Sequence, residues 1–137
     1  MLFRSRFPDD PELLYLSGLA ACRKGDYEAA LGPLVRSVEL DPRLRFGEPY
    51  LLAGDALMAL GRADEAIDAY DRFLRSSSSS VEGFVKRARA HAKAGEKDGQ
   101  KKDLAEALTT WAQIPGFQRR KQVGWWRCGS GASRIAQ

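Results

Sequence analysis

The chain has 137 residues, of which 44% are hydrophobic and 29% are charged, as in a soluble globular protein of one domain. No apolar run approaches the roughly eighteen residues of a membrane span, and the first residues lack the apolar core of a secretory signal. We therefore expect a cytoplasmic protein, unless the chain is part of a longer one. The two cysteines, Cys22 and Cys128, lack metal-ligand spacing and are expected to be reduced.

The net charge of +4 is unevenly distributed. Residues 115–137 contain five basic residues and no acidic one, whereas residues 1–114 carry a net charge of −1. The basic character therefore belongs to the C-terminal segment, and the body of the protein is close to neutral.

After a lead-in over residues 1–10, the sequence predicts a helix over 11–24. Asp10 can cap its first turn, Pro11 suits the first helical position, and Gly25 can close its end in a left-handed conformation. The next helix is expected over 27–40, where apolar residues recur at helical spacing. Pro33 lies inside it and should bend it, since proline removes one backbone hydrogen bond.

The same pattern recurs further along the chain. When the sequence is aligned with itself at an offset of 36 residues, Gly18 aligns with Gly54, and Ala30 aligns with Ala66. At an offset of 34 residues, Ala88 aligns with Gly54. Such a period predicts three helix pairs, over 11–44, 47–80 and 81–114, with Arg45 and Phe46 as an insertion. First helices are expected over 47–60 and 81–94, ended by Gly61 and Gly95, and small residues at the crossings should let paired helices approach closely.

The spacing and the places of Gly18, Ala30 and Pro42, then Gly54, Ala66 and Tyr70, resemble the tetratricopeptide repeat (TPR) family. The resemblance covers about 11–114. It implies an all-α superhelix of three helix-turn-helix repeats, followed by a capping segment. Unit three departs from the pattern: Gln100 replaces the small residue and should loosen that helix crossing, and Lys97 and Lys101 replace apolar residues.

The resemblance also implies a concave groove, lined by the first helix of each unit, that holds a protein or peptide partner. Apolar positions would contact the partner, and charged ones would orient it. The matching residues are Glu12, Tyr15, Leu19, Arg23, Glu48, Leu51, Asp55, Met58, Glu82, Val85, Arg89 and Lys93.

Some members of the family clamp the C-terminal carboxylates of chaperones. The matching positions here are Tyr15, Leu19, Leu52, Glu82 and Lys86, of which only Lys86 keeps a suitable charge. The resemblance therefore does not extend to this clamp. Separately, Glu12, Glu48 and Glu82 recur at the second position of every unit. They either form an acidic ladder for a basic partner or serve the positive ends of their helices.

The sequence predicts no catalysis, cofactor, metal or small-molecule substrate, because it has no phosphate loop, nucleophile elbow or Cys/His pair. His91, the one histidine, falls at an inward-facing position and is expected to be packed.

Residues 115–137 leave alternatives open. Trp125, Trp126 and their neighbours could cap the exposed face of unit three, or the segment could be a frayed tail. Its basic and aromatic residues could instead bind nucleic acid or an anionic membrane, with the repeats as a spacer. The chain could also be the repeat portion of a larger enzyme, and an exposed terminal face would permit a homodimer.

Overall fold

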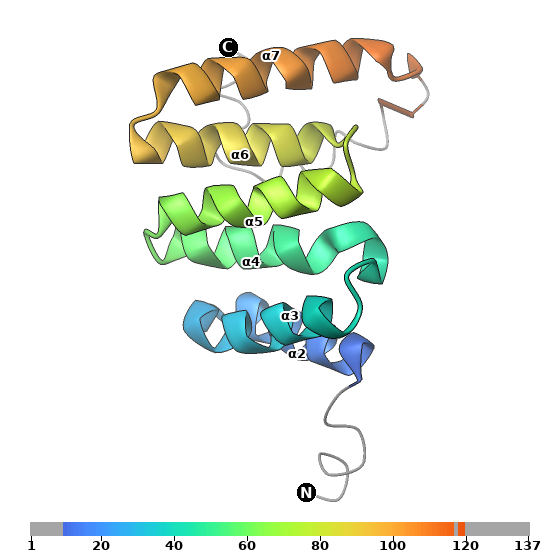
Figure 1. Cartoon of the computed structure of the whole chain (residues 1–137), viewed down its shortest axis with the longest axis vertical. Coiled ribbons are helices and arrows are strands. Elements are labelled where there is room, and N and C mark those ends of the chain that lie inside the picture. The colour runs from blue at the N-terminus through green and yellow to red at the C-terminus, as the bar shows by residue number, and fades with distance from the viewer. Residues whose placement is uncertain (1–9, 117, 120–137) are drawn as a thin grey trace, which may run out of the picture.

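The computed structural model describes residues 10–116 and 118–119. The fold is a row of antiparallel helix pairs that follow one another in chain order (Figure 1). The helices are α2 (Pro11–Lys24), α3 (Tyr27–Leu40), α4 (Glu48–Ala59), α5 (Ala63–Ser76), α6 (Val81–Ala94) and α7 (Lys97–Gln113). Each pair packs on the next, through α3 on α4 and α5 on α6. The described residues contain no strand, and the predicted all-α repeat fold is confirmed.

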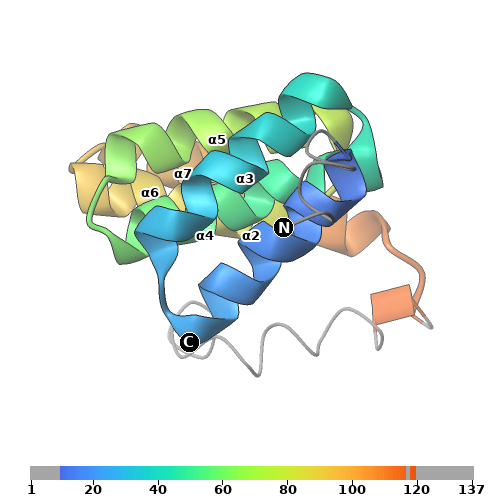
Figure 2. The same ribbon diagram turned by 90° about the horizontal axis from the view of Figure 1, so that it is seen from below.

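The helix ends follow the local chemistry. The Asp10 carboxylate accepts hydrogen bonds from the backbone amides of Glu12 and Leu13, at 2.9 and 3.4 Å. Gly25, Gly61 and Gly95 have φ values of 81°, 78° and 81°, the left-handed conformation predicted for them. Viewed along the stack (Figure 2), α3 and α5 lie on one side of the molecule and α2 on the other.

Small residues set the separation of paired helices, as predicted. A Cβ added to Gly18 would lie 2.4 Å from Leu34 Cγ, and one on Gly54 would lie 2.4 Å from Tyr70 Cε1. Ala30 and Ala66 have no exposed surface. The larger side chains then fill three connected apolar clusters, whose buried members include Leu34, Tyr70 and Val85.

The helix α3 runs through Pro33 without interruption. Gly32 precedes the proline and carries no Cβ to clash with its ring, which makes helical backbone before proline tolerable. The bend expected at Pro33 stays a prediction.

The predicted insertion is the irregular link between units one and two. It lies in the short turn η1 (Leu44–Gly47), where Arg45 and Phe46 have φ values of 48° and 57°. Among the described residues, Arg45 and Phe46 are the residues other than glycine that have a positive φ. Phe46 is 80% exposed, so packing of its side chain does not offset the energetic cost of this backbone conformation.

Replacing Phe46 with glycine is therefore expected to raise the free energy of unfolding by about 0.5–1 kcal/mol. Glycine adopts this backbone at little cost, and the exposed ring contributes little to the core. Urea unfolding followed by circular dichroism measures the change. A loss of stability would mean that the Phe46 ring makes a contact that holds the turn.

In unit three, Lys97 and Lys101 are exposed at the start of α7. The crossing of α6 and α7 is close at Gly99, where a Cβ would lie 2.7 Å from His91 Nδ1. The loosening expected from Gln100 stays a prediction. Phe117 and residues 120–137, including Trp125 and Trp126, lie outside the described residues, as do residues 1–9. The predicted cap and tail functions are thus untested.

Candidate functional site

The residues predicted to line the groove lie on α2, α4 and α6, the first helices of the three units. Nine of them are at least partly exposed and form what we call the first-helix face. They are Glu12, Leu19, Arg23, Glu48, Asp55, Met58, Glu82, Arg89 and Lys93.

The other three, Tyr15, Leu51 and Val85, are buried, with exposed fractions of 2%, 8% and 1%. Each fills a core cluster instead: Tyr15 packs among residues of α3 and α4, Leu51 among those of α5, and Val85 among those of α7. Corresponding positions of three repeats therefore hold the array together. We correct the prediction that these side chains offer apolar contacts, and only Leu19 and Met58 keep partly exposed apolar surface on this face.

At the N-terminal end of this face, Glu12 pairs with Arg45, the inserted residue. The Arg45 Nε donates to Glu12 Oε1 at 3.0 Å, and its guanidinium lies 4.6 Å from the centre of the Tyr15 ring. Burial, followed by the neighbouring Glu48 carboxylate, raises the pKa of Tyr15 to about 12. The insertion thus fastens unit one to the turn that leads into unit two.

Asp55 is the centre of a polar cluster in the middle of the face. Its carboxylate accepts from the Tyr70 hydroxyl at 2.7 Å and from Lys86 Nζ at 2.6 Å. Lys86 also lies 3.2 Å from Glu82. Although burial opposes it, the pKa of Lys86 is raised by Asp55 and Glu82. The one base that matches a chaperone-clamp position is therefore neutralised within the fold.

The row of glutamates is not a free acidic ladder. Glu12 is paired with Arg45, and Glu82 with Lys86. All three glutamates lie in the first turn of their helices, where a negative charge is favourable. The geometry therefore favours the reading in which they serve local structure.

Arg89 is the unusual residue of the face. Its Nε and Nη2 atoms are buried and have no hydrogen-bond partner. Among the described residues, no other buried side-chain nitrogen or oxygen is left without one. Arg23 and Lys93, near the C-terminal ends of α2 and α6, are exposed.

A polar network that sequence reasoning missed joins α6 to its neighbours. Asp103 of α7 is 2% exposed and accepts from Arg87 Nε and Nη2, at 2.8 and 2.6 Å. The same guanidinium donates to Asp71 of α5 at 2.5 Å. His91 lies between Glu96, at 2.7 Å, and Asp103, at 3.4 Å, with 15% of its side chain exposed. The prediction that His91 is packed is confirmed.

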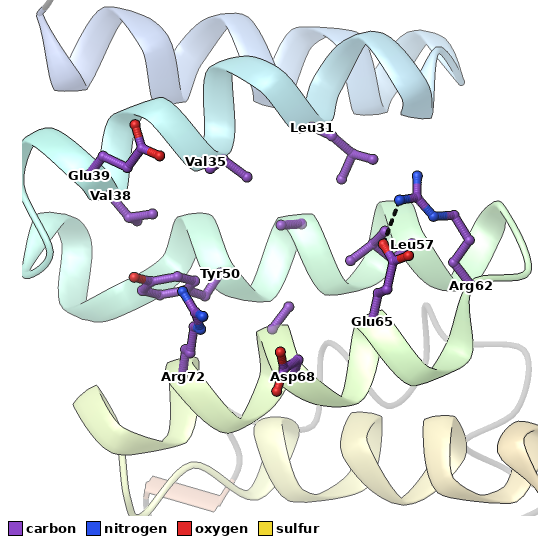
Figure 3. A pocket seen from close by; sticks show the side chains of 12 residues that line it. Leu31, Val35, Val38, Glu39, Tyr50, Leu57, Arg62, Glu65, Asp68 and Arg72 are labelled. Carbon is purple, nitrogen blue, oxygen red and sulfur yellow. Dashed lines mark hydrogen bonds and ion pairs between the residues drawn. The ribbon is translucent and has the colours of Figure 1, made fainter.

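An apolar groove also lies on the opposite side of α4, between α3 and α5 (Figure 3). Its volume is about 410 Å³, and Tyr50 and Leu57 of α4 form its floor. Residues two apart on a helix point in nearly opposite directions, so the row through Ala53 faces away from Asp55. Leu31 and Val35 of α3 line one wall, and charged residues of α5, including Arg72, line the other. We call this surface the α3–α5 groove.

Two further features were considered for the described residues, a grouping of metal ligands and a membrane-spanning helix, and neither is present. Over residues 10–116 and 118–119, no three His, Cys, Asp or Glu side chains are grouped so that they could hold a metal ion. None of the helices there has both the length and the apolar character needed to cross a membrane. Cys22 is a free thiol whose pKa is raised by burial and by Asp55.

Together, these features define a helical-repeat protein whose successive units present one mixed, charged face. A family model for the tetratricopeptide repeat matches residues 2–44 and 51–114, so the chain belongs to the TPR family. The match omits residues 45–50, which begin with the insertion. TPR repeats generally mediate protein–protein interaction, and proteins with this fold are typically non-catalytic scaffolds.

Solved structures of MamA have the same fold. One, a crystal structure of the MamA protein, has a TM-score of 0.75 and 22% identity, and covers 81% of this chain and 60% of its own. A second, of MamA AMB-1, has a TM-score of 0.73 and 20% identity, and covers 85% of this chain and 62% of its own. This chain thus spans about 60% of the length of these structures. A comparison with curated proteins found no matching relative.

Proposed function

We propose that this chain is a non-catalytic TPR scaffold that binds a protein or peptide partner on its first-helix face. The observation that carries the proposal is the alignment of charged side chains from three successive first helices on one side of the stack. Arg23 and Lys93 are exposed, so they are available to orient a partner. Leu19 and Met58 supply the apolar contacts, in place of the three buried residues.

A photocrosslinker placed at residue 58 tests the proposal. Met58→benzoylphenylalanine is expected to form a protein adduct in the native cell, because the side chain lies on the first-helix face. Val35→benzoylphenylalanine is the matched control, since Val35 is 48% exposed in the α3–α5 groove. Denaturing electrophoresis and mass spectrometry of the adducts give the comparison.

Adducts that form from residue 35 and not from residue 58 would contradict the proposal and move the binding site to the α3–α5 groove. The basic tail is tested in the same cells by deleting residues 120–137. Loss of every adduct on this deletion would favour the alternative in which the tail is the binding element and the repeats are a spacer.

A further inference from the structure

Phe46 is presented on the surface of the protein instead of packing in its core. Among the described residues it is the most exposed large hydrophobic side chain, at 80%, and its backbone has a φ of 57°. Such backbone strain persists only where the surrounding structure imposes it, and it gathers at functional sites. Here the Phe46 carbonyl accepts a hydrogen bond from the Ser77 hydroxyl at 2.9 Å, and the preceding Arg45 is paired with Glu12. The fold therefore holds the turn in a conformation that exposes the ring.

The α3–α5 groove adjoins this turn. Its lining includes Val38, in the last turn of α3, and Tyr50, in the first turn of α4, and η1 connects these two helix ends. Figure 3 shows both residues at the same end of the groove, together with Arg72 of α5. Phe46 does not fill the groove of its own chain, because it does not line the groove and its ring stays exposed. Each chain thus carries an exposed ring and an open groove close together.

The groove has the size and the chemistry to receive a phenyl ring. Its volume is about 410 Å³, and an apolar cavity of about 150 Å³ is enough to bind benzene. Val35 is 48% exposed and leaves apolar surface uncovered on one wall. Tyr50 can pack edge-to-face against a second aromatic ring, and the Arg72 guanidinium at the same end can lie over its face. An aromatic side chain is therefore a better occupant than an aliphatic or a charged one.

We propose that Phe46 of a second copy of this chain binds in the α3–α5 groove. Because the ring and the groove lie close together on one chain, two copies related by a two-fold axis would each receive the ring of the other. Association through one ring per groove is expected to be weak and concentration-dependent, as for small interfaces. The inference goes beyond the proposed function and does not rest on it, since the groove lies on the opposite side of α4 from the first-helix face. A pair of copies would present two first-helix faces at once, which strengthens binding to a partner that repeats its binding segment.

Sedimentation velocity of the full chain over a range of concentrations tests the proposal. The parent is expected to pass from monomer to dimer below about 1 mM, and Phe46→Gly to raise the dissociation constant by about thirty-fold or more, as for the loss of a central aromatic anchor. Leu108→Ala is the matched control, because Leu108 is a large side chain on α7 that is 69% exposed, and it is expected to change the constant by less than about three-fold. Since Phe46→Gly is expected to stabilise the monomer, its loss of association would not result from unfolding.

Three outcomes of this measurement would overturn the proposal. A parent that stays monomeric at about 1 mM would show that the groove does not bind the ring. A dimer that Leu108→Ala weakens and Phe46→Gly does not would place the contact on the terminal face of unit three. Phe46→Asn removes the ring with a residue that tolerates a positive φ, so it is expected to weaken association as Phe46→Gly does. If Phe46→Asn associated like the parent, the conformation of the turn and not the ring would be the cause.

A mixing experiment shows whether the ring binds in this groove. Val35→Glu places a charge in the groove at an exposed position, and by itself it is expected to weaken association as Phe46→Gly does. In a mixture of the two variants, one copy keeps its groove and the other keeps its ring. A heterodimer is therefore expected in native mass spectrometry, which separates the two chains by mass, while circular dichroism checks that each is helical. A mixture that associates no better than either variant alone would overturn the proposal.

Crosslinking in the cell separates this inference from the proposed function. Phe46→benzoylphenylalanine keeps an aromatic ring and is expected to form an adduct of twice the chain mass, with crosslinked peptides from α3 or α4. The control at residue 35 is expected to give the same self-adduct, which mass spectrometry distinguishes from a partner adduct at residue 58. An adduct from residue 46 that contains another protein and not this chain would overturn the inference. Absence of the partner adduct at residue 58 alone would contradict the proposed function and leave this inference standing.

Discussion

Gly54→Ala is expected to lower the free energy of unfolding by about 3 kcal/mol. The added methyl would lie 2.4 Å from Tyr70 Cε1 and 2.8 Å from two further ring carbons, so α4 and α5 would have to separate. The ring cannot swing aside easily, because Tyr70 is 1% exposed and its hydroxyl donates to Asp55. Urea unfolding followed by circular dichroism measures the loss.

Two further variants show whether the clash is the cause. Ala59→Leu enlarges an exposed residue of the same helix and is expected to change stability by less than about 0.5 kcal/mol. Tyr70→Leu removes the ring, so its combination with Gly54→Ala should cost less than the sum of the single changes. Strict additivity of the two would contradict the close packing of Gly54 on Tyr70.

Asp103→Leu is expected to cost about 3–5 kcal/mol, because it leaves the Arg87 guanidinium without its main partner. The carboxylate provides two of the acceptors of Arg87 and is itself almost fully buried. The hydrogen bonds that Arg87 donates to Asp103, opposed by burial and helped by the one to Asp71, raise the pKa of Arg87. The guanidinium still keeps its charge when Asp103 is removed, because arginine does not lose its proton in proteins. The unfolding midpoint in urea gives the measurement.

The neutral isostere and an exposed acid supply the controls for this change. Asp103→Asn keeps one oxygen acceptor and should lose less stability than Asp103→Leu. Glu106→Gln alters an exposed carboxylate of the same helix and is expected to stay within about 0.5 kcal/mol of the parent. If Asp103→Leu cost no more than Glu106→Gln, the network would contribute nothing to the fold.

The sequence was sufficient to predict the repeat fold because sterics leave a strong signal at the crossings. Gly18, Gly54, Ala30 and Ala66 recur at one spacing, and only small residues fit where paired helices meet. The ends of the first helices can also be predicted from their glycines, since the left-handed backbone conformation there excludes most side chains.

The candidate site was harder to predict. Periodicity places Tyr15, Leu51 and Val85 at one corresponding position, but it cannot tell a groove-facing position from one that packs on the next helix pair. Asp103 was missed because an aspartate is rarely buried unless it is paired, and its partner Arg87 lies 16 residues earlier in the sequence. The alignment of Asp103 with Ala69, 34 residues earlier, was a usable signal, because Ala69 is buried.

Arg87 lies on α6 and contacts both α5 and α7, and this affects how the molecule unfolds. This side chain holds Asp71 of unit two and Asp103 of unit three at once. In a linear array, each repeat is stabilised mainly by its nearest neighbour, so such a bridge adds directly to the coupling between two adjacent units. The last helix pair should therefore melt together with the one before it, in a single cooperative transition, and should not fray from the end of the array.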